Sequence, residues 1–282
     1  MTATICDTRP CELGEGAFWH PERQQLFWFD ILSARLLSFD VTGPLAWQFD
    51  EMHSAAGWID RDTLLLASET GLWRFDIGSG TRERLAEIEA ADDLTRSNDG
   101  RADPHGGFWI GTMGKHAEPG AGAIYRYVDG KVTQLYDSIS IPNAICFSPD
   151  GRTAHFADTA RQIIWRVELD ADGWPCGERE VFLDLGAQGL FPDGAVIDAE
   201  GALWNAQWGA GRVARYLPDG QFDREILVGG RHSACPAFGG HDLRRLYVST
   251  AREGIEHPDA AQGLLYQAES PVAGLAEPRV RA

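Results

Sequence analysis

The chain has 282 residues, of which 44% are hydrophobic and 32 are glycine, enough apolar material for a large core in one domain. Its formal net charge of −17, with 2 lysines against 23 arginines, repels nucleic-acid phosphates and anionic lipid. No stretch approaches the ~20 apolar residues of a membrane span. The first residues do not show a basic region followed by an apolar run. We therefore expect a cytoplasmic protein, a monomer or weak homo-oligomer, that binds neither nucleic acid nor membranes. The five cysteines are odd in number and lack a CxxC pair, which indicates no disulfide framework.

A short hydrophobic segment recurs six times at intervals of 38 to 49 residues. In chain order, these predicted strands are 26–29, 64–67, 108–111, 154–157, 203–206 and 246–249. A tight-turn signal precedes most of them, and a second segment, often with alternating apolar and polar residues, follows. A repeat of this length is typical of a β-propeller blade with four antiparallel strands. We therefore predict an all-β fold without a long helix, a six-bladed β-propeller that occupies 1–282 as a single domain.

One residue able to contact a metal or a substrate lies 10 or 11 positions before each of these six strands. These residues are Glu15, His53, Asn98, Asn143, Asp193 and Cys235. In a propeller the start of each blade's innermost strand faces the central axis, so residues in equivalent phase converge at one mouth of the channel. Two carboxylates and two amides are then expected to face each other.

Such an oxygen-rich set suits a divalent cation such as Ca²⁺, Mg²⁺ or Mn²⁺ and lacks the thiolates and histidines of a structural zinc site. Because the protein supplies few ligands, some coordination positions of the ion stay open to water or substrate. Open positions are typical of catalytic metal sites. The alternative is that residues such as Asn143 and Asp193 merely form turns next to their prolines. That alternative does not account for Glu15, which stands between two glycines where no turn needs a glutamate. For His53 we favour a histidine bonded to the backbone, with substrate binding as the alternative. For Cys235 we favour a thiol packed under its blade, with a thiol that faces the channel as the alternative.

Seven motifs then occur in order along the chain. They are 13–19 (LGEGAFW), 96–103 (RSNDGRAD), 111–113 (GTM), 141–144 (IPNA), 191–194 (FPDG), 198–204 (DAEGALW) and 235–240 (CPAFGG). Together they resemble the senescence marker protein/gluconolactonase/regucalcin family of six-bladed propellers over essentially the whole chain. The resemblance implies a hydrolase of carbohydrate catabolism that opens an aldono-1,4- or 1,5-lactone with one divalent metal ion. The identity of that ion stays open among Ca²⁺, Zn²⁺, Mn²⁺, Mg²⁺ and Fe²⁺.

By residue-level match, the resemblance implies that Glu15, Asn143 and Asp193 hold the metal. It also implies that Arg96 and Asn98 contact substrate hydroxyls or the ring carbonyl. The adjacent Asp99 is counted with them as a substrate-binding residue, and it orients the loop or a water. Asp193 is the best candidate for catalytic base, because a carboxylate can accept a proton and hand it to the leaving ring oxygen. Arg96 offers a rigid fork of donors for a developing oxyanion; a surface salt bridge is its alternative role.

One position departs from the family pattern. Counted without gaps from Asn98, the substrate-contacting glutamate of regucalcin-like members falls on His116, which follows Lys115. In that register the substrate wall is positive or neutral, which favours a lactone with an anionic group, such as a sulfonated or uronic sugar lactone. A loop shift is the alternative. Trp208 lies beyond its strand and is a candidate ligand contact, whereas the other recurring tryptophans are expected between blades.

Two other functions stay open. One is a metal-binding or scaffold propeller without turnover, because propellers often serve as interaction platforms. The other is hydrolysis of a different ester by the same ion. The lactonase is favoured by an intact site set, because a scaffold has no need for Arg96 beside an open metal site. That set comprises Glu15, Arg96, Asn98, Asn143 and Asp193.

Overall fold

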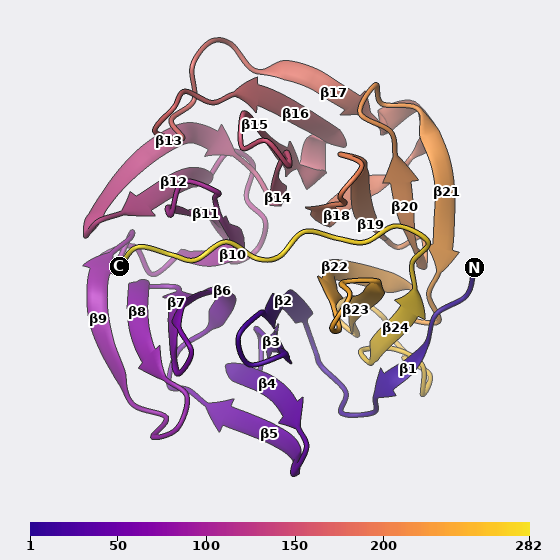
Figure 1. Ribbon diagram of the computed structural model, residues 1–282, viewed down its shortest axis with the longest axis horizontal. Coiled ribbons are helices and arrows are strands. Elements are labelled where there is room, and N and C mark those ends of the chain that lie inside the picture. Colours follow the sequence, from indigo (N-terminus) through magenta and orange to yellow (C-terminus); the bar gives the residue numbers. More distant parts are fainter.

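The computed structural model describes residues 1–282 and consists almost entirely of β-structure. Six four-stranded antiparallel sheets stand around a central axis as blades (Figure 1). The only helices are two short 3-10 turns, η1 (Thr159–Arg161) and η2 (Gly186–Gln188). No helix therefore has the length and apolar character that a membrane span requires. The six-bladed β-propeller predicted from the repeat is confirmed.

The strands occupy equivalent positions in each blade, and the innermost strands contact one another around the axis. The innermost strands are β2 (Gly14–His20), β6 (His53–Asp60), β10 (Thr95–Ala102), β14 (Pro142–Phe147), β18 (Phe191–Ile197) and β22 (His232–Gly239). The second strands are β3 (Gln25–Asp30), β7 (Thr63–Ser68), β11 (Phe108–Gly114), β15 (Thr153–Asp158), β19 (Leu203–Trp208) and β23 (Arg245–Ala251). The third strands are β4 (Arg35–Asp40), β8 (Gly71–Asp76), β12 (Gly122–Val128), β16 (Ile163–Glu168), β20 (Arg212–Tyr216) and β24 (Leu265–Glu269). The outermost strands are β5 (Gly43–Gln48), β9 (Arg82–Glu87), β13 (Lys131–Ile139), β17 (Glu180–Asp184), β21 (Phe222–Leu227) and β1 (Thr4–Asp7).

All six hydrophobic segments predicted as strands lie inside the second strands. The turn signals before them form the hairpins from the innermost strands. We number the blades in chain order of their innermost strands, so that blade 1 begins with β2 and blade 6 with β22. In blade 3, for example, the Asp103 carboxylate accepts hydrogen bonds from the backbone N–H groups of His105 and Gly107. The six in-phase residues lie ten positions before the first residue of their second strands, which places each of them in the first half of an innermost strand.

The ring closes without a covalent link. The N-terminal strand β1 pairs antiparallel with β24, with Thr4 opposite Gln267, and so becomes the outermost strand of the blade formed by β22, β23 and β24. This pairing covers an edge that would otherwise be open. The pairing thus joins the N-terminal strand of the chain to its last strand within one blade.

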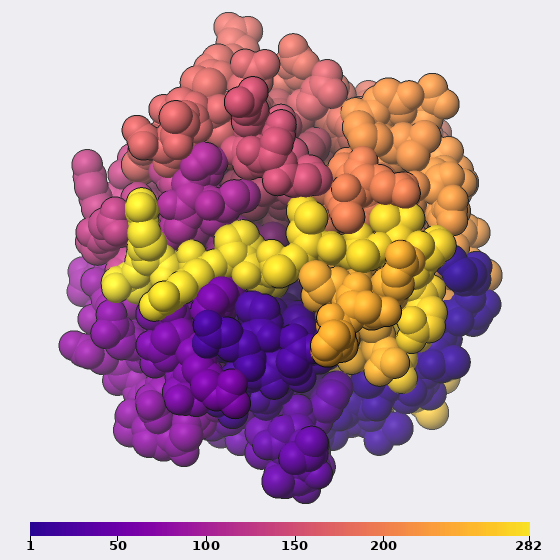
Figure 2. Space-filling view, in the orientation of Figure 1, coloured from indigo at the N-terminus to yellow at the C-terminus, as the bar shows by residue number.

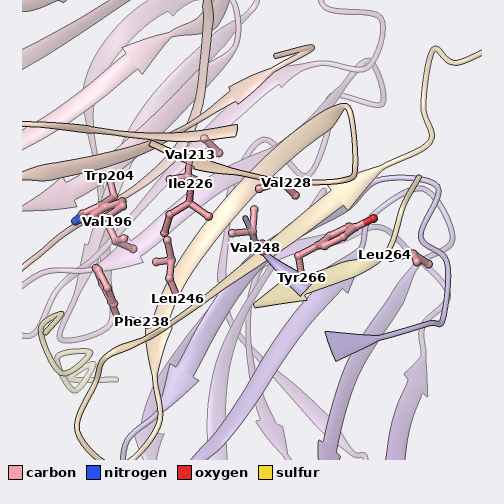
Figure 3. Packing of buried hydrophobic residues seen from close by; sticks show 12 residues of the cluster. Val196, Trp204, Val213, Ile226, Val228, Phe238, Leu246, Val248, Leu264 and Tyr266 are labelled. Carbon is pink, nitrogen blue, oxygen red and sulfur yellow. The ribbon is translucent and has the colours of Figure 1, made fainter. Parts of the chain in front are cut away.

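The hydrophobic core is divided into six buried clusters, one at each interface between neighbouring blades. Figure 3 shows the cluster between blades 5 and 6, where Trp204 and Val213 lie near Leu246. Trp28, Trp109 and Trp204 are completely buried in these clusters, as predicted for the recurring tryptophans. Because a fully buried large apolar side chain stabilises by about 2 kcal/mol or more, these interfaces hold the blades in a rigid ring.

The C-terminal segment, residues 270–282, crosses one face of the ring (Figures 1 and 2). The backbone N–H of Ala199 donates to the carbonyl of Ala273, and that of Val280 donates to Trp58, both over 2.9 Å. These contacts lie near the hairpins that follow the innermost strands. The candidate site residues lie at the opposite ends of the same strands.

Candidate active site

A cavity of about 500 Å³ opens at the first residues of the innermost strands. Four of the six in-phase residues line it, namely Glu15, Asn98, Asn143 and Asp193, together with Arg96. A larger hollow of about 810 Å³ lies at the hairpin-turn end of blade 4, beside the turns of blade 5, and contains none of the predicted site residues. The predicted convergence is therefore observed at one mouth of the channel for these residues.

A β-bulge brings each of these side chains to the cavity. The pairing between innermost and second strand shifts by one residue beside Glu15, Asn98, Asn143 and Asp193. A bulge bends its strand and re-aims the side chains around it. Next to Glu15, Gly16 has a φ of +55°, and a Cβ there would lie 2.0 Å from the carbonyl oxygen of Ser54. This close approach explains why a glycine follows the glutamate.

His53 and Cys235 occupy the same level of the ring but do not line the cavity. Nδ1 of His53 contacts the carbonyl oxygen of Glu51 over 3.0 Å, and burial lowers the pKa of this histidine to about 3. The Cys235 thiol is buried against the carbonyl of Ala17, and burial raises its pKa. Both residues have the structural roles expected for them.

A directed chain of hydrogen bonds crosses the floor of the cavity. Nη1 of Arg96 donates to Oδ1 of Asn98 over 2.8 Å, and Nδ2 of Asn98 donates to Oδ1 of Asn143 over 3.2 Å. Nδ2 of Asn143 donates to Oγ1 of Thr159 over 2.8 Å, and that hydroxyl donates to the carbonyl of Pro192 over 2.6 Å. The chain therefore links β10, β14, η1 and β18.

The two ends of this chain determine the orientation of both amides. Arg96 is only a donor and the carbonyl of Pro192 is only an acceptor, so each group between them has one orientation that satisfies both neighbours. Oδ1 of Asn143 consequently points away from Thr159. A carbonyl oxygen has two lone pairs, and Asn98 uses one of them, so the other is available to a cation.

Glu15 and Asp193 supply two buried carboxylates, with residue exposures of 6% and 4%. Neither forms an ion pair, and the Glu15 carboxylate accepts only the N–H of Gly16, over 3.1 Å. Burial and the charge of Asp99 raise the pKa of Glu15 to about 8. Burial and the charge of Glu15 raise the pKa of Asp193 well above its usual range.

These residues fit one divalent cation. Two uncompensated carboxylates beside an amide oxygen are hard oxygen ligands, and a cation would offset the repulsion that raises both pKa values. The chain brings no group of three His, Cys, Asp or Glu side chains together for a metal. The donor set is therefore a mixed one that includes the Asn143 amide.

Arg96 is buried, with 6% exposure, and forms no ion pair, which excludes the surface salt bridge considered for it. Only its Nη1 is engaged, by the carbonyl of Ser97 and by Asn98. Its Nε and Nη2 have no protein acceptor and are available to a ligand in the cavity.

Asp99 lies below the floor and does not line the cavity. Its Oδ2 accepts the backbone N–H of Ile145 over 2.8 Å, which ties β10 to β14. Arg101 contacts the same residue, because its Nε donates to the Ile145 carbonyl over 3.2 Å. Of the roles expected for Asp99, this position fits orientation of the backbone beside Asn143 and not direct contact with a substrate.

Lys115 and His116 both line the cavity, directly after the end of β11. His116 is exposed at the rim. Nζ of Lys115 lies 2.6 Å from Oε2 of Glu69 in a half-buried ion pair. The positive charge of this wall is therefore partly neutralised.

Further residues that line the cavity include Thr159, Trp208 and Glu253. Trp208 lines the cavity as a candidate ligand contact, but it is the last residue of β19 and does not lie beyond the strand, because β19 extends two residues past the predicted segment. Thr159 and Glu253 were not singled out from the sequence. Thr159 directly follows the second strand β15, and Glu253 lies two residues after the second strand β23. Their position relative to the blade repeat is the sequence signal that points to this mouth of the channel.

Residues 13–252 match the family pattern described as "SMP-30/Gluconolactonase/LRE-like region". The chain is 34% identical over 278 residues to the 6-deoxy-6-sulfogluconolactonase of Pseudomonas putida, which covers 96% of this chain and 95% of the relative. It is 35% identical over 286 residues to the L-arabinolactonase of Azospirillum brasilense, covering 98% and 94%. The crystal structure of regucalcin, a calcium-binding protein from Agrobacterium tumefaciens, is 42% identical and superposes with a TM-score of 0.96 over 100% of this chain and 98% of that chain.

Proposed function

The chain belongs to the SMP-30/gluconolactonase/LRE-like family, and from this premise we propose that it hydrolyses a sugar lactone to the aldonic acid with one divalent metal ion. The observation that carries the proposal is the buried Arg96, with free donors, beside three convergent oxygen ligands in an open cavity. Two relatives are named as lactonases of different sugars. Opening of a lactone ring is therefore the shared reaction, and the sugar varies.

Glu15, Asn143 and Asp193 would hold the ion. When bound, it supplies Lewis-acid polarisation of the lactone carbonyl and a lower pKa for water. The reaction adds the oxygen of water to the carbonyl carbon and breaks the bond from that carbon to the ring oxygen. Asp193 takes the proton from the attacking water and passes it to the ring oxygen, which becomes a free hydroxyl.

Arg96 stabilises the negative charge that develops on the carbonyl oxygen. Its guanidinium is held in place by the Ser97 carbonyl and by Asn98 before substrate arrives, so its free Nε and Nη2 need little reorganisation. In a buried position such a charged donor acts more strongly than in water. A scaffold propeller has no use for this arrangement, which favours turnover over binding alone.

The preferred ion stays open among Ca²⁺, Zn²⁺, Mn²⁺, Mg²⁺ and Fe²⁺, since carboxylate and amide oxygens accept each of them. The Agrobacterium relative is described as calcium-binding, which supports a test with Ca²⁺ first. A cytoplasmic location and a monomeric or weakly oligomeric state remain predictions.

An anionic group on the substrate is the finer part of the proposal. The position of Lys115 and His116 in the cavity wall and the name of the Pseudomonas relative support it. The ion pair of Lys115 with Glu69 opposes it, because part of the positive charge is already compensated. Lys115→Met should lower kcat/KM for a sulfonated lactone more than for the plain sugar lactone.

The decisive experiment is pH-stat titration of proton release from a panel of sugar lactones, with and without an anionic group. The protein is first stripped of metal and then reloaded with one ion at a time, and each rate is corrected for spontaneous hydrolysis. Ion-dependent acid release is expected. If no lactone releases acid faster than the blank with any of the five ions, the protein is a binding module.

A further inference from the structure

Glu253 is a carboxylate at the cavity that neither the proposed metal site nor the proposed mechanism uses. It follows β23, and its backbone is fixed on both sides. Its N–H donates to the carbonyl of Glu12 over 2.9 Å, and its own carbonyl contacts Nδ1 of His232 over 2.9 Å. The side chain lines the cavity, is only partly exposed, and forms neither a hydrogen bond nor an ion pair. A rigid backbone thus presents free acceptor oxygens.

The other carboxylates near the cavity are engaged or assigned. Glu15 and Asp193 form the proposed ion site on the floor. Glu69 is held by the Lys115 ammonium and accepts the backbone N–H of Met52. Among the carboxylates that line the cavity, Glu253 is the one left for the substrate.

An apolar surface lies beside this acceptor. The Trp208 ring stacks on His232, with ring centroids 4.2 Å apart and planes 18° apart, and Phe191 is paired with Trp208 across β18 and β19. Phe191 keeps 42% of its surface exposed at this mouth. A sugar ring has an apolar C–H face and a rim of hydroxyl donors, which matches an aromatic surface next to a free carboxylate.

We propose that Glu253 accepts hydrogen bonds from ring hydroxyls of the lactone and selects polyhydroxylated lactones over unsubstituted ones, a role that rests on the proposed function. A hydroxyl donor offsets the desolvation of this half-buried carboxylate. A lactone without hydroxyls leaves the carboxylate desolvated and unpaired, and is bound less well. Glu253 is then a specificity-determining residue that touches the substrate.

The test compares D-gluconolactone with δ-valerolactone, which has the same six-membered ring without hydroxyl groups. Glu253→Ala should raise KM for D-gluconolactone by about 10-fold or more, the loss of one charged hydrogen bond, with kcat nearly unchanged. KM for δ-valerolactone should not rise and should fall, because the variant no longer leaves an unpaired carboxylate desolvated. Glu253→Gln keeps one acceptor oxygen and should restore part of the loss. Glu256→Gln, an exposed glutamate of the same loop that does not line the cavity, is the matched control and should change neither.

A binding measurement separates this inference from the lactonase proposal. Anhydroglucitol, a cyclic ether with the sugar hydroxyls but no carbonyl, is titrated against wild type and Glu253→Ala by ligand-observed NMR. Weaker binding to the variant supports the inference even if wild type opens no lactone, in which case only the proposed function fails. The inference is overturned if anhydroglucitol binds both proteins equally or binds neither, or if the variant loses activity equally toward both lactones.

Discussion

Arg101 of β10 and Glu277 of the C-terminal segment form a buried ion pair, with side-chain exposures of 9% and 12%. Arg101 also donates to the carbonyl of Ile145 in β14, and Asp99 accepts the N–H of the same residue. Ile145 lies two residues after Asn143. The C-terminal segment is therefore connected, through Arg101 and β14, to the strand that carries a proposed metal ligand.

Glu277→Ala should lower the free energy of unfolding by about 3 kcal/mol, because it leaves the Arg101 guanidinium buried without its partner charge. The control is Glu269→Ala, which removes an exposed pair with Arg245 and should cost less than about 1 kcal/mol. Urea unfolding of both variants measures the difference. Equal losses would show that burial of the Arg101 pair contributes nothing.

Asp193→Ala should reduce kcat at least about 100-fold while the propeller stays folded, because it removes both a metal ligand and the proposed base. Activity is measured at saturating ion, and circular dichroism checks the fold. Asp172→Ala, at an exposed position outside the cavity, is the control and should behave like wild type. Near-normal turnover of the fully metal-loaded Asp193 variant would remove Asp193 from the mechanism.

Arg96→Ala should lower kcat/KM by about 100-fold, the loss expected for one preorganised donor to the developing oxyanion. Steady-state kinetics on the best lactone give the value. Arg61→Ala, which removes an exposed guanidinium at the opposite end of its blade, should leave it unchanged. If kcat/KM is the same for both variants, Arg96 does not contact the reacting group.

Thr159→Val should weaken ion binding by about 10-fold, because Nδ2 of Asn143 loses its acceptor and the amide loses its single orientation. Thr133→Val, on the outer strand β13 and without a side-chain hydrogen bond, is the matched control. Isothermal titration of metal-free protein with Ca²⁺ or Mn²⁺ measures both. An unchanged affinity would mean that the Asn143 amide is oriented by Asn98 alone.

The stability of the metal-free protein should fall as the pH rises. Burial and the charge of Asp99 raise the pKa of Glu15 from 4.5 to about 8, so the folded chain binds more protons than the unfolded chain between these values. Stability is then lost progressively as the pH increases through this window. A bound cation offsets the charge of Glu15.

The rise in Tm on adding ion should therefore be larger at about pH 8 than at about pH 5.5. Thermal unfolding in chelator and in excess Ca²⁺ or Mn²⁺ at both pH values measures it. In Glu15→Gln the pH dependence of the metal-free protein should be reduced. An ion effect that is equal at both pH values in wild type would contradict this assignment.

Local patterns in the sequence determined the fold class. Period-two alternation and turn residues such as Asp103 and Gly106 act over a few positions, so they predict strands and hairpins wherever they occur. Their repetition predicted six blades, and their phase predicted that Glu15, Asn98, Asn143 and Asp193 meet. The start of an innermost strand has the same place in every blade, so this convergence follows from the repeat.

Only the tertiary structure decided the long-range contacts. The pairing of β1 with β24, the course of the C-terminal segment and its Arg101–Glu277 ion pair join residues far apart in the chain, and no local pattern encodes them. The packing of neighbouring blades also decided which in-phase side chains reach the cavity. His53 and Cys235 share the phase but are held by nearby carbonyl groups. Thr159 and Glu253 reach the cavity from segments that follow the second strands. The Thr159 hydroxyl donates to the carbonyl of Pro192, and the backbone N–H of Glu253 donates to the carbonyl of Glu12.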